Sequence, residues 1–365
     1  MPRHKARITI REVARAAGVS TQTVSRVINN RPDVAPETFV RVQDVIKKTG
    51  YAPNDLARSL IRGRSHTLGV VAYGLDYFGP SRVLTGIESQ AAALGYSIFL
   101  NLIHRPEADG MEQVLETLFA RQVDAVIWAI PEIGNNRAWA LDPSPDFPAP
   151  VAFVSGLSRV AGLPLVGVDN RAIGRLATGQ LIAGDARRIG IVTGPMDWWE
   201  AQQRHLGWRE SLEAAGLEAD SRLVAAGDWD ARSGTQGLYQ LLAQGPDIDA
   251  VFASNDQMAL GVLHVAHRLG RRVPEDLAVV GVDNTPESAH YWPPLTTVRQ
   301  RLREAGALVV EQLDRLIQES GRARRQQSAQ PPASTLLQPE LIVRESTRKV
   351  ASAAPPPLSP DGSST

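Results

Sequence analysis

Apolar positions in about the first 50 residues recur at helical spacing. Thr9 followed by Glu12 is the pattern of a capping box and predicts a helix start, and Gly18 ends that helix. Ser20 is placed to cap a second helix directly afterwards. The inward positions of the two helices are predicted to be Val13, Ala16, Ala17, Val24, Val27 and Ile28. Two short helices joined by a tight glycine turn predict a helix-turn-helix unit.

A third helix follows a short loop. Pro36 suits its first position, although Ala35 before it is a poor capping residue. Its apolar positions lead to two lysines and Gly50, which are typical of a helix end. The three helices together predict a small all-α domain at residues 1–50.

From about residue 65 the pattern changes to short continuous apolar runs separated by helical patterns. The runs predict strands at 67–73, 96–103, 123–130, 150–156, 165–170, 187–194, 250–255, 277–284 and, as one returning strand, 336–346. Helices are predicted between them, for example at 83–94 and 111–121. Buried strands alternating with helices predict parallel sheets covered on both faces. There are too many strands for one such sheet, so the body is expected to be α/β with two doubly wound subdomains and a ligand site at the carboxyl ends of the strands.

Charge separates the same two regions. Residues 1–64 carry 13 Lys and Arg against 5 Asp and Glu, a balance of +8, whereas the rest carries −8 and the whole chain is neutral. A basic head on an acidic body suggests a polyanion partner, although a merely basic surface would give the same balance. The chain has no cysteine, no apolar run long enough to span a bilayer and no signal-peptide pattern. A cytoplasmic protein associated with the nucleoid, without contact to a membrane, is therefore expected.

The second helix carries side chains that can read DNA. Gln22 can pair with adenine, Arg26 with guanine, and Thr21 can contact a base edge or a thymine methyl. Other polar residues of the helix are better suited to caps or phosphates; they are Ser20, Thr23, Ser25 and Asn29. A small helical bundle with a polar face is the alternative interpretation.

The body lacks enzyme motifs but has the chemistry of a sugar site. No dinucleotide, P-loop, zincin or nucleophile-elbow pattern is present, and no catalytic, metal or cofactor site is predicted. Asp/Asn pairs at strand ends (169–170, 255–256 and 283–284) are interpreted as partners for hydroxyl groups. Trp198 and Trp229 lie in or beside loops and suit the apolar face of a sugar ring, whereas Trp208 is assigned to the core. A sugar-active enzyme and a sugar-transport protein remain alternatives.

Three residues at the start of the helix expected after Asn255 receive separate assignments. Asp256 is interpreted as the cap of the helix that follows it, and Met258 and Leu260 are assigned to the core.

Three stretches carry a resemblance to a known family: "ITIREVARAAGVSTQTVSRVIN", "GYAPNDLARSL" and "ASNDQMALGVL". They resemble the lac repressor family of bacterial transcription regulators, and the likeness runs from about Thr9 to Arg344. The resemblance implies a periplasmic-binding-protein-like body, a homodimer on a pseudo-palindromic operator in double-stranded DNA, and a small sugar effector. The expected function is repression of sugar-utilisation genes, relieved by the sugar; a co-repressor or an activator of the same family is the alternative.

The resemblance also implies site residues. Residues 51–64 would be a hinge that enters the minor groove, where Leu60 wedges between base pairs; Leu60 in an ordinary core is the alternative. Beyond the second helix, the implied DNA-binding set comprises Thr9, Tyr51, Asn54, Ala57 and Leu60. The implied effector-binding set comprises Tyr73, Tyr77, Pro80, Ser155, Trp198, Arg204, Trp229, Asn255, Asp283 and Gln300. Ser155 stands where an aspartate is expected, and a galactoside-like glycoside is the predicted ligand.

The expected organisation is then a head (1–50), a hinge (51–64), a body (65–346) and a disordered Pro- and Ser-rich tail (347–365). Within the body, one subdomain is assigned 65–165 with 295–325, and the other 166–292 with 333–346. No leucine heptad follows the body, so assembly is expected to stop at a dimer, through the first subdomain.

Overall fold

The computed structural model describes residues 8–51, 64–105, 111–131, 133, 147–154, 163–323 and 334–348. The chain divides into two compact units, Met1–Ser65 and His66–Thr365. The predicted hinge contacts at Asn54, Ala57 and Leu60, the predicted effector contact at Ser155 and most of the predicted tail lie outside the described residues. No helix in the described part of the chain is long and apolar enough to cross a membrane.

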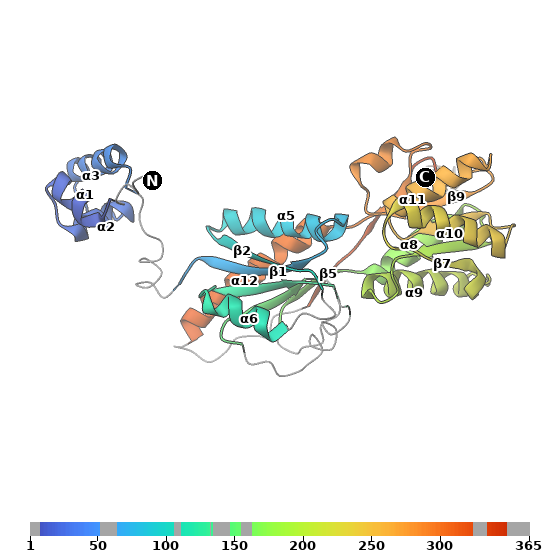
Figure 1. Cartoon of the computed structure of the whole chain (residues 1–365), viewed down its shortest axis with the longest axis horizontal. Helices are drawn as coiled ribbons and strands as arrows, with labels where there is room; N and C mark the ends of the chain where they lie inside the picture. Colours follow the sequence, from blue (N-terminus) through green and yellow to red (C-terminus); the bar gives the residue numbers. More distant parts are fainter. Residues whose placement is uncertain are drawn as a thin grey trace, which may run out of the picture. The chain divides into compact units, whose positions relative to one another are not determined.

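The first unit contains the predicted three helices (Figure 1). They are α1 (Ile10–Ala17), α2 (Thr21–Ile28) and α3 (Pro36–Thr49). Thr9 and Glu12 form the predicted capping box of α1, and Ser20 caps α2 by accepting from the backbone N–H of Thr23. Ala35 makes no side-chain cap, as expected of alanine, and Gly18 and Gly50 end their helices in the left-handed conformation.

The core of this unit is small and differs from prediction at one position. Val13, Ala14, Ala17, Val24, Val27 and Val42 form it. Ala14 is buried and Ala16 is exposed, so the inward side of α1 was assigned one residue wrongly at this point. Ala14 and Ala16 flank the buried Val13 and Ala17 on the two sides of this eight-residue helix, so spacing alone does not decide between them. The packing of α1 against α2 and α3 decides which alanine is covered.

In the residues that the structure describes, the second unit contains two six-stranded sheets. The first has the order β11-β5-β4-β3-β1-β2, and its strands are β1 (Thr67–Tyr73), β2 (Ser97–Ile103), β3 (Ala125–Ala129), β4 (Val151–Val154), β5 (Leu165–Val168) and β11 (Thr335–Leu337). The second has the order β12-β10-β9-β8-β6-β7, and its strands are β6 (Ile189–Thr193), β7 (Val224–Ala226), β8 (Ala250–Ala253), β9 (Ala278–Val282), β10 (Thr296–Arg299) and β12 (Glu340–Ile342). The pairs are parallel except that β12 runs antiparallel to β10.

Helices cover both faces of each sheet (Figure 1). They are α5 (Phe78–Ala93), α6 (Met111–Ala120), α8 (Asn170–Ala183), α9 (Trp199–Ala214), α10 (Ala231–Gln244), α11 (Asp256–Arg268) and α12 (Leu302–Ala323), with short 3-10 helices η1 (Ser221–Leu223) and η2 (Pro286–His290). On the first sheet, α5 and α12 share one apolar cluster with the strands, and α6 shares another on the opposite face. The doubly wound class predicted from the alternating pattern is confirmed for both sheets.

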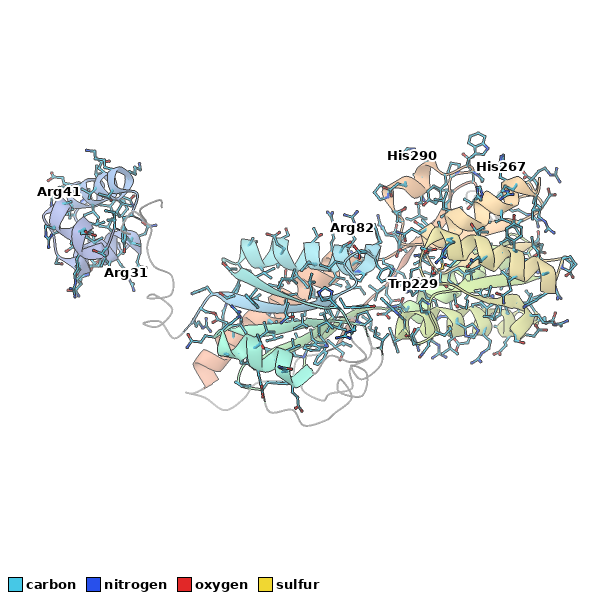
Figure 2. The ribbon with its side chains drawn as sticks, in the orientation of Figure 1. Arg31, Arg41, Arg82, Trp229, His267 and His290 are labelled. Carbon is cyan, nitrogen blue, oxygen red and sulfur yellow. The ribbon has the colours of Figure 1, made fainter. Side chains whose placement is uncertain are left out.

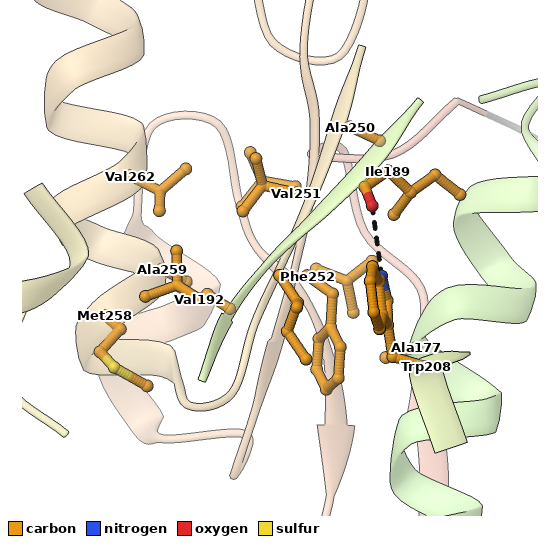
Figure 3. Packing of buried hydrophobic residues seen from close by; sticks show 14 of the residues in the cluster. Ala177, Ile189, Val192, Trp208, Ala250, Val251, Phe252, Met258, Ala259 and Val262 are labelled. Carbon is orange, nitrogen blue, oxygen red and sulfur yellow. Dashed lines mark hydrogen bonds between the residues drawn. The ribbon is translucent and has the colours of Figure 1, made fainter. Parts of the chain in front are cut away.

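Adjacent residues of β8 show how each strand supplies both faces (Figure 3). Val251 points toward Val262 and Ala259 of α11, and Phe252 points toward Trp208 of α9. Trp208 is 1% exposed and donates from Nε1 to the carbonyl oxygen of Ile189 at 3.2 Å. Its assignment to the core is therefore confirmed.

Three helix pairs cross unusually closely, and each crossing uses one glycine from each helix. The glycine pairs are Gly86 with Gly306 in α5–α12, Gly174 with Gly207 in α8–α9, and Gly234 with Gly261 in α10–α11. A Cβ atom on any of the six would overlap a backbone carbonyl oxygen of the partner helix. Side chains cannot relieve a clash with backbone, so these glycines set the distance between helices whose N-termini line the cavity described below.

Sheet membership corrects the predicted subdomain boundaries. β5 and β11 belong to the first sheet, although residues 166–168 and 335–337 were assigned to the second subdomain. β10 belongs to the second sheet, although it was assigned to the first subdomain. The predicted single strand 336–346 is divided at Gln338 and Pro339, and its halves β11 and β12 pair in different sheets. The chain therefore passes between subdomains directly after a strand, which an alternating strand and helix pattern does not reveal.

Candidate functional site

The exposed face of α2 keeps only part of the polar set predicted for it. Thr21, Gln22 and Arg26 are exposed. Ser20 and Thr23 bond each other, with their hydroxyl oxygens 2.9 Å apart, and Ser20 also caps the helix. Thr21 and Gln22 therefore project outward from the first turn of α2, and Arg26 from its last turn.

The remaining predicted residues of the head have local structural partners. Asn29 donates from Nδ2 to the carbonyl oxygen of Ser25 at 2.6 Å, so the two half-buried side chains close the end of α2. Tyr51 is half-buried against the core of the head. Arg26 lies 3.5 Å from Asp33 in an exposed ion pair, which holds the guanidinium only weakly.

Two cations that sequence reasoning missed lie on the same unit. Arg31 and Arg41 are exposed (Figure 2), and neither has an ion pair within the described residues. Free guanidinium groups on a basic domain are suited to phosphate oxygens. Their only sequence signal is the basic balance of the head.

A cavity of about 120 Å³ lies in the second unit, where helix N-termini and strand ends of both sheets meet. Its walls are Tyr77, Phe78, Gly79, Pro80, Val83, Ala129, Pro131, Val154, Gly167, Val168, Asn170, Trp198, Glu200, Arg204, Trp229, Asn255, Gln257, Asp283, Gln300, Leu302 and Ala305. Eight of the predicted effector residues are among them: Tyr77, Pro80, Trp198, Arg204, Trp229, Asn255, Asp283 and Gln300. The cavity is predominantly apolar with a few convergent polar groups, as small-molecule sites usually are.

Arg204 of α9 is the buried cation of the cavity, at 5% exposed. It donates from Nε to Asn170 Oδ1 at 2.8 Å and from one terminal nitrogen to the carbonyl oxygen of Ser254 at 2.5 Å. Burial lowers the pKa of Arg204, and the charge of Asp283 opposes that shift. Two bonds fix the guanidinium, and its remaining N–H groups are available to a ligand.

Asp283 and Gln300 face the same cavity from the ends of β9 and β10. Gln300 Nε2 donates to Asp283 Oδ1 at 2.6 Å. Burial raises the pKa of Asp283 to about 6, although Arg204 and Gln300 favour its charged form. Asp283 adopts φ 112° and Asn284 φ 53°, both in the left-handed region that non-glycine residues avoid. Strain of this kind is common where a side chain must point into a site.

An aromatic wall faces these polar groups. The Trp198 ring lies edge-on to Tyr77 at 5.5 Å and to Trp229 at 5.8 Å between centroids. Arg204 lies over the Trp229 ring, with Cζ 5.4 Å from its centroid. Tyr73, which was predicted to line the site, is not among the walls and packs behind Trp198 at 6.0 Å.

Trp229 has two unusual features. It is 7% exposed with φ 75°, and its Nε1 has no hydrogen-bond partner in the described structure. Its ring lies directly on Gly194, where any Cβ would overlap it. Trp229, which is labelled in Figure 2 and lines the cavity, is therefore held in one orientation by a glycine contact and has a strained backbone conformation.

The helix cap that begins α11 corrects one assignment. Asn255, not Asp256, is the N-cap, because its Oδ1 accepts from the backbone N–H of Met258 at 2.8 Å. Asn255 also donates to the carbonyl oxygen of Trp229 at 2.8 Å and to Gln257 Oε1. Met258 is buried as predicted, whereas Leu260 is 42% exposed and does not belong to the core.

Asp256 instead supports the strained turn behind the cavity. Its carboxylate accepts from the backbone N–H of Thr285 at 2.8 Å and from Thr297 Oγ1 at 2.6 Å. Asn284 in turn donates from its backbone to Thr297 Oγ1, and Arg344 donates to Asn284 Oδ1. These bonds hold the backbone that carries Asp283.

Asp256→Asn is expected to remove a pH dependence of stability. Burial, with the charge of Asp283, raises the pKa of Asp256 to about 7, so the folded protein retains a proton that the unfolded chain loses near pH 4. The contribution of Asp256 to the free energy of unfolding is therefore complete below pH 4 and is lost as pH rises to 7. Asparagine is uncharged, and it can accept from the Thr285 N–H through Oδ1 while its Nδ2 donates to Thr297 Oγ1. The variant should therefore gain about 2 kcal/mol in the free energy of unfolding relative to the parent as pH rises from 5 to 8. Urea unfolding across this range measures it.

Asp256→Ala is the matched control for that experiment. It removes the same charge but leaves the Thr285 N–H buried without an acceptor, so it should be less stable than Asp256→Asn at every pH. Equal pH profiles for the parent and Asp256→Asn would contradict the assignment of the proton to Asp256.

Two polar residues that line the cavity were not predicted from the sequence; they are Glu200 and Gln257. Glu200 is in the first turn of α9, four residues before Arg204, so both project from one side of that helix. The i, i+4 spacing from Arg204, a predicted site residue, could therefore have identified Glu200 from the sequence. No group of three or more His, Asp or Glu residues in the described part of the chain is arranged to hold a metal ion.

Two family models match the chain. One described as bacterial regulatory proteins, lacI family, matches residues 9–54, and one described as a periplasmic binding protein-like domain matches residues 178–347. Among curated relatives, the HTH-type transcriptional regulator CelR of Thermobifida fusca is 35% identical over 360 residues, covering 93% of this chain and 98% of CelR. The lactose operon repressor of Escherichia coli strain K12 is 32% identical, covering 85% of each chain.

Solved structures agree with these relatives. The lac repressor dimer bound to operator and the anti-inducer ONPF has TM-score 0.82 and 30% identity, covering 94% of this chain and all of that one. A complex of the transcriptional regulator CelR with cellobiose has TM-score 0.67 and 33% identity, covering 93% and 100%. Because CelR matches nearly the whole chain at 35% identity, this protein belongs to the lacI family of bacterial regulatory proteins and is a DNA-binding regulator of transcription.

Proposed function

We propose that this protein is a homodimeric repressor that binds a pseudo-palindromic operator and leaves it when a β-glycoside enters the cavity. The observation that carries the ligand half of the proposal is the buried Arg204 and Asp283 opposite Trp198 and Trp229. Apolar C–H faces of a sugar ring pack on indoles, while hydroxyls bond guanidinium, carboxylate and amide groups.

On DNA, α2 is the recognition helix of this proposal. Thr21 and Gln22 are exposed near its N-terminus, which is the part of a recognition helix that meets base edges. Arg31 and Arg41 would contact phosphates, and residues 51–64 would form the hinge proposed from the sequence. A dimer would place two such helices on half-sites about one helical turn apart.

The first sheet offers a surface for the dimer. Within the described residues, β2 is an edge strand of that sheet, and Leu100 and Leu102 on it are 39% and 41% exposed. Leu94, which follows α5, is 40% exposed. An apolar edge strand is a liability unless another chain covers it, so we place the twofold contact here.

The ligands of two relatives suggest which sugars to test first. CelR has been solved with cellobiose, and the lac repressor with ONPF. With 35% identity to CelR, we take cellobiose as the first candidate and galactosides as the second. A co-repressor role for the same ligand is the alternative, because the sign of the response depends on which state the ligand prefers.

The proposed switch has two states that differ in the angle between subdomains. The sugar favours the state in which the hinges separate, and operator affinity falls. Coupling in such systems is typically about 1–3 kcal/mol and must be reciprocal, so operator should weaken sugar binding by the same factor.

A footprint of the purified protein on DNA upstream of its own gene tests this proposal. The experiment is repeated with cellobiose, galactosides, other glucosides and pentosides. A protected palindrome that one sugar releases supports three parts of the proposal together: that the protein is a repressor, that this sugar is its effector, and that the effector weakens operator binding. Protection that strengthens with sugar indicates a co-repressor, and protection that no sugar changes contradicts the proposed ligand.

Gln22→Ala is expected to relax base preference at one operator position. Losing a bidentate pair costs about 1–3 kcal/mol for the preferred base and little for the others. Binding to a set of single-base operator variants by fluorescence anisotropy measures it. Arg31→Ala is the comparison, because it should weaken all sequences alike and reduce the salt slope. A uniform loss for Gln22→Ala would contradict direct readout by α2.

A further inference from the structure

An open groove of about 500 Å³ adjoins the cavity and shares Phe78, Asp283, Gln300 and Leu302 with it. A ligand that fills the cavity can therefore extend into the groove past the side chains that the two have in common. We call it the arginine groove because Arg82, Arg299, Arg301 and Arg303 line it. Its acidic lining residues are Asp283, which is buried, and Glu304.

Two of the four guanidinium groups already have acidic partners. Arg299 is paired with Glu340, and Arg301 Nε lies 2.8 Å from Glu304. In the described part of the chain, neither Arg82 nor Arg303 has an ion-pair or hydrogen-bond partner for its side chain. Arg82 is half-buried, with Cζ 4.8 Å above the Phe78 ring (Figure 2). Most arginines elsewhere in the second unit are paired, so these two form an uncompensated positive site beside the cavity.

The two free arginines stand on rigid elements. Arg82 belongs to α5 and Arg303 to α12, the helices that cross at Gly86 and Gly306. The carbonyl oxygen of Arg303 is itself the atom that excludes a Cβ at Gly86. The backbone positions of both residues are therefore fixed, and both guanidinium groups are suited to an anion in the groove that they line.

We propose that the arginine groove binds an anionic substituent of the effector, so that the effector is a glycoside carrying a phosphate or a carboxylate. This inference rests on the proposed function, since the uncharged part of the ligand occupies the cavity. The aromatic wall and Arg204 hold the sugar ring, and Arg82 and Arg303 hold the charged group outside it.

Calorimetric titration of the full chain tests the inference with five ligands: cellobiose, its 6-phosphate and 6′-phosphate esters, cellobiouronic acid and inorganic phosphate. At least one anionic sugar should bind about tenfold tighter than cellobiose, with an advantage that shrinks as salt is raised. Arg82→Gln and Arg303→Gln should each remove most of that advantage. Arg268→Gln is the matched control, because Arg268 is exposed on α11 away from the groove and also has no ion pair in the described structure.

The outcomes separate this inference from the proposed function. Tighter binding of the phosphate esters alone assigns the groove to phosphate, and tighter binding of the uronate as well assigns it to anions in general. If cellobiose binds at least as tightly as every anionic sugar, the inference is overturned while the proposed function stands. The same holds if both arginine variants keep the anionic advantage. If no sugar binds, the cavity assignment and this inference fail together.

Discussion

Gly174→Ala is expected to destabilise the second unit by about 3 kcal/mol, whereas Gly179→Ala on the same helix should stabilise it by about 0.5–1 kcal/mol. At Gly174 a Cβ would overlap the carbonyl oxygen of Arg204 and crowd the backbone of Gly207 and Trp208. At Gly179 no atom lies within 4 Å of a Cβ, and alanine has the higher helix propensity. The same substitution is thus expected to change the free energy of unfolding in opposite directions at two positions of one helix, five residues apart.

Thermal and urea unfolding of the two variants measure this pair of effects. The clash at Gly174 also lies at the carbonyl of Arg204, so the variant should bind sugar more weakly even where it is folded. Gly207→Ala, which meets the carbonyl oxygen of Arg171 from the other helix, should match Gly174→Ala. Equal stability of Gly174→Ala and Gly179→Ala would show that α8 and α9 can separate freely.

Arg204→Lys is expected to weaken sugar binding by about 100-fold or more while the protein still binds operator. A lysine keeps the charge but cannot reproduce the two directed bonds to Asn170 and Ser254 and still present N–H groups to a ligand. Losing a buried charge-assisted contact costs about 2–5 kcal/mol. The variant should therefore remain on operator at sugar concentrations that release the parent.

Arg209→Ala provides the control for this result. Arg209 lies on the same helix but is exposed, with Glu213 at 3.7 Å, and surface pairs contribute less than about 1 kcal/mol. It should leave both sugar affinity and operator release unchanged. Sugar affinity is measured by calorimetry and release by anisotropy of labelled operator. An Arg204→Lys variant that responds to sugar like the parent would exclude this cavity as the effector site.

In residues 1–50, local sequence patterns were sufficient to predict where the helices begin and end. Thr9, Ser20, Gly18 and Gly50 each act within four residues of their own position, and each has the predicted capping role. Short-range hydrogen bonds and left-handed glycines depend on neighbours in sequence, so they can be derived without a structure. The burial of Ala14 in place of Ala16 is the exception, because it depends on how α1 packs against α2 and α3.

For the strands and the cavity as well, some features could be predicted from the sequence and others depended on tertiary packing. The apolar runs predicted most of the strands, since a strand buried on both faces is continuous in sequence. Their sheet membership was not predictable, because β5, β10 and β11 each lie next to a crossing between subdomains. Of the residues that line the cavity, polar residues at strand ends were identified from the sequence. The place of Glu200 in the lining, and of Tyr73 outside it, depends on tertiary packing.

The sequence by itself determined the helix-turn-helix, its charge, the α/β class of the body and, through its resemblance to a family, most of the polar cavity residues. Only the tertiary structure decided three further features. The glycine crossings, the support of the Asp283 turn by Asp256 and the unpaired Arg82 and Arg303 each join segments far apart in the chain. Their physical basis is close contact and burial, which arise when helices and sheets pack, and no spacing within a single segment encodes them.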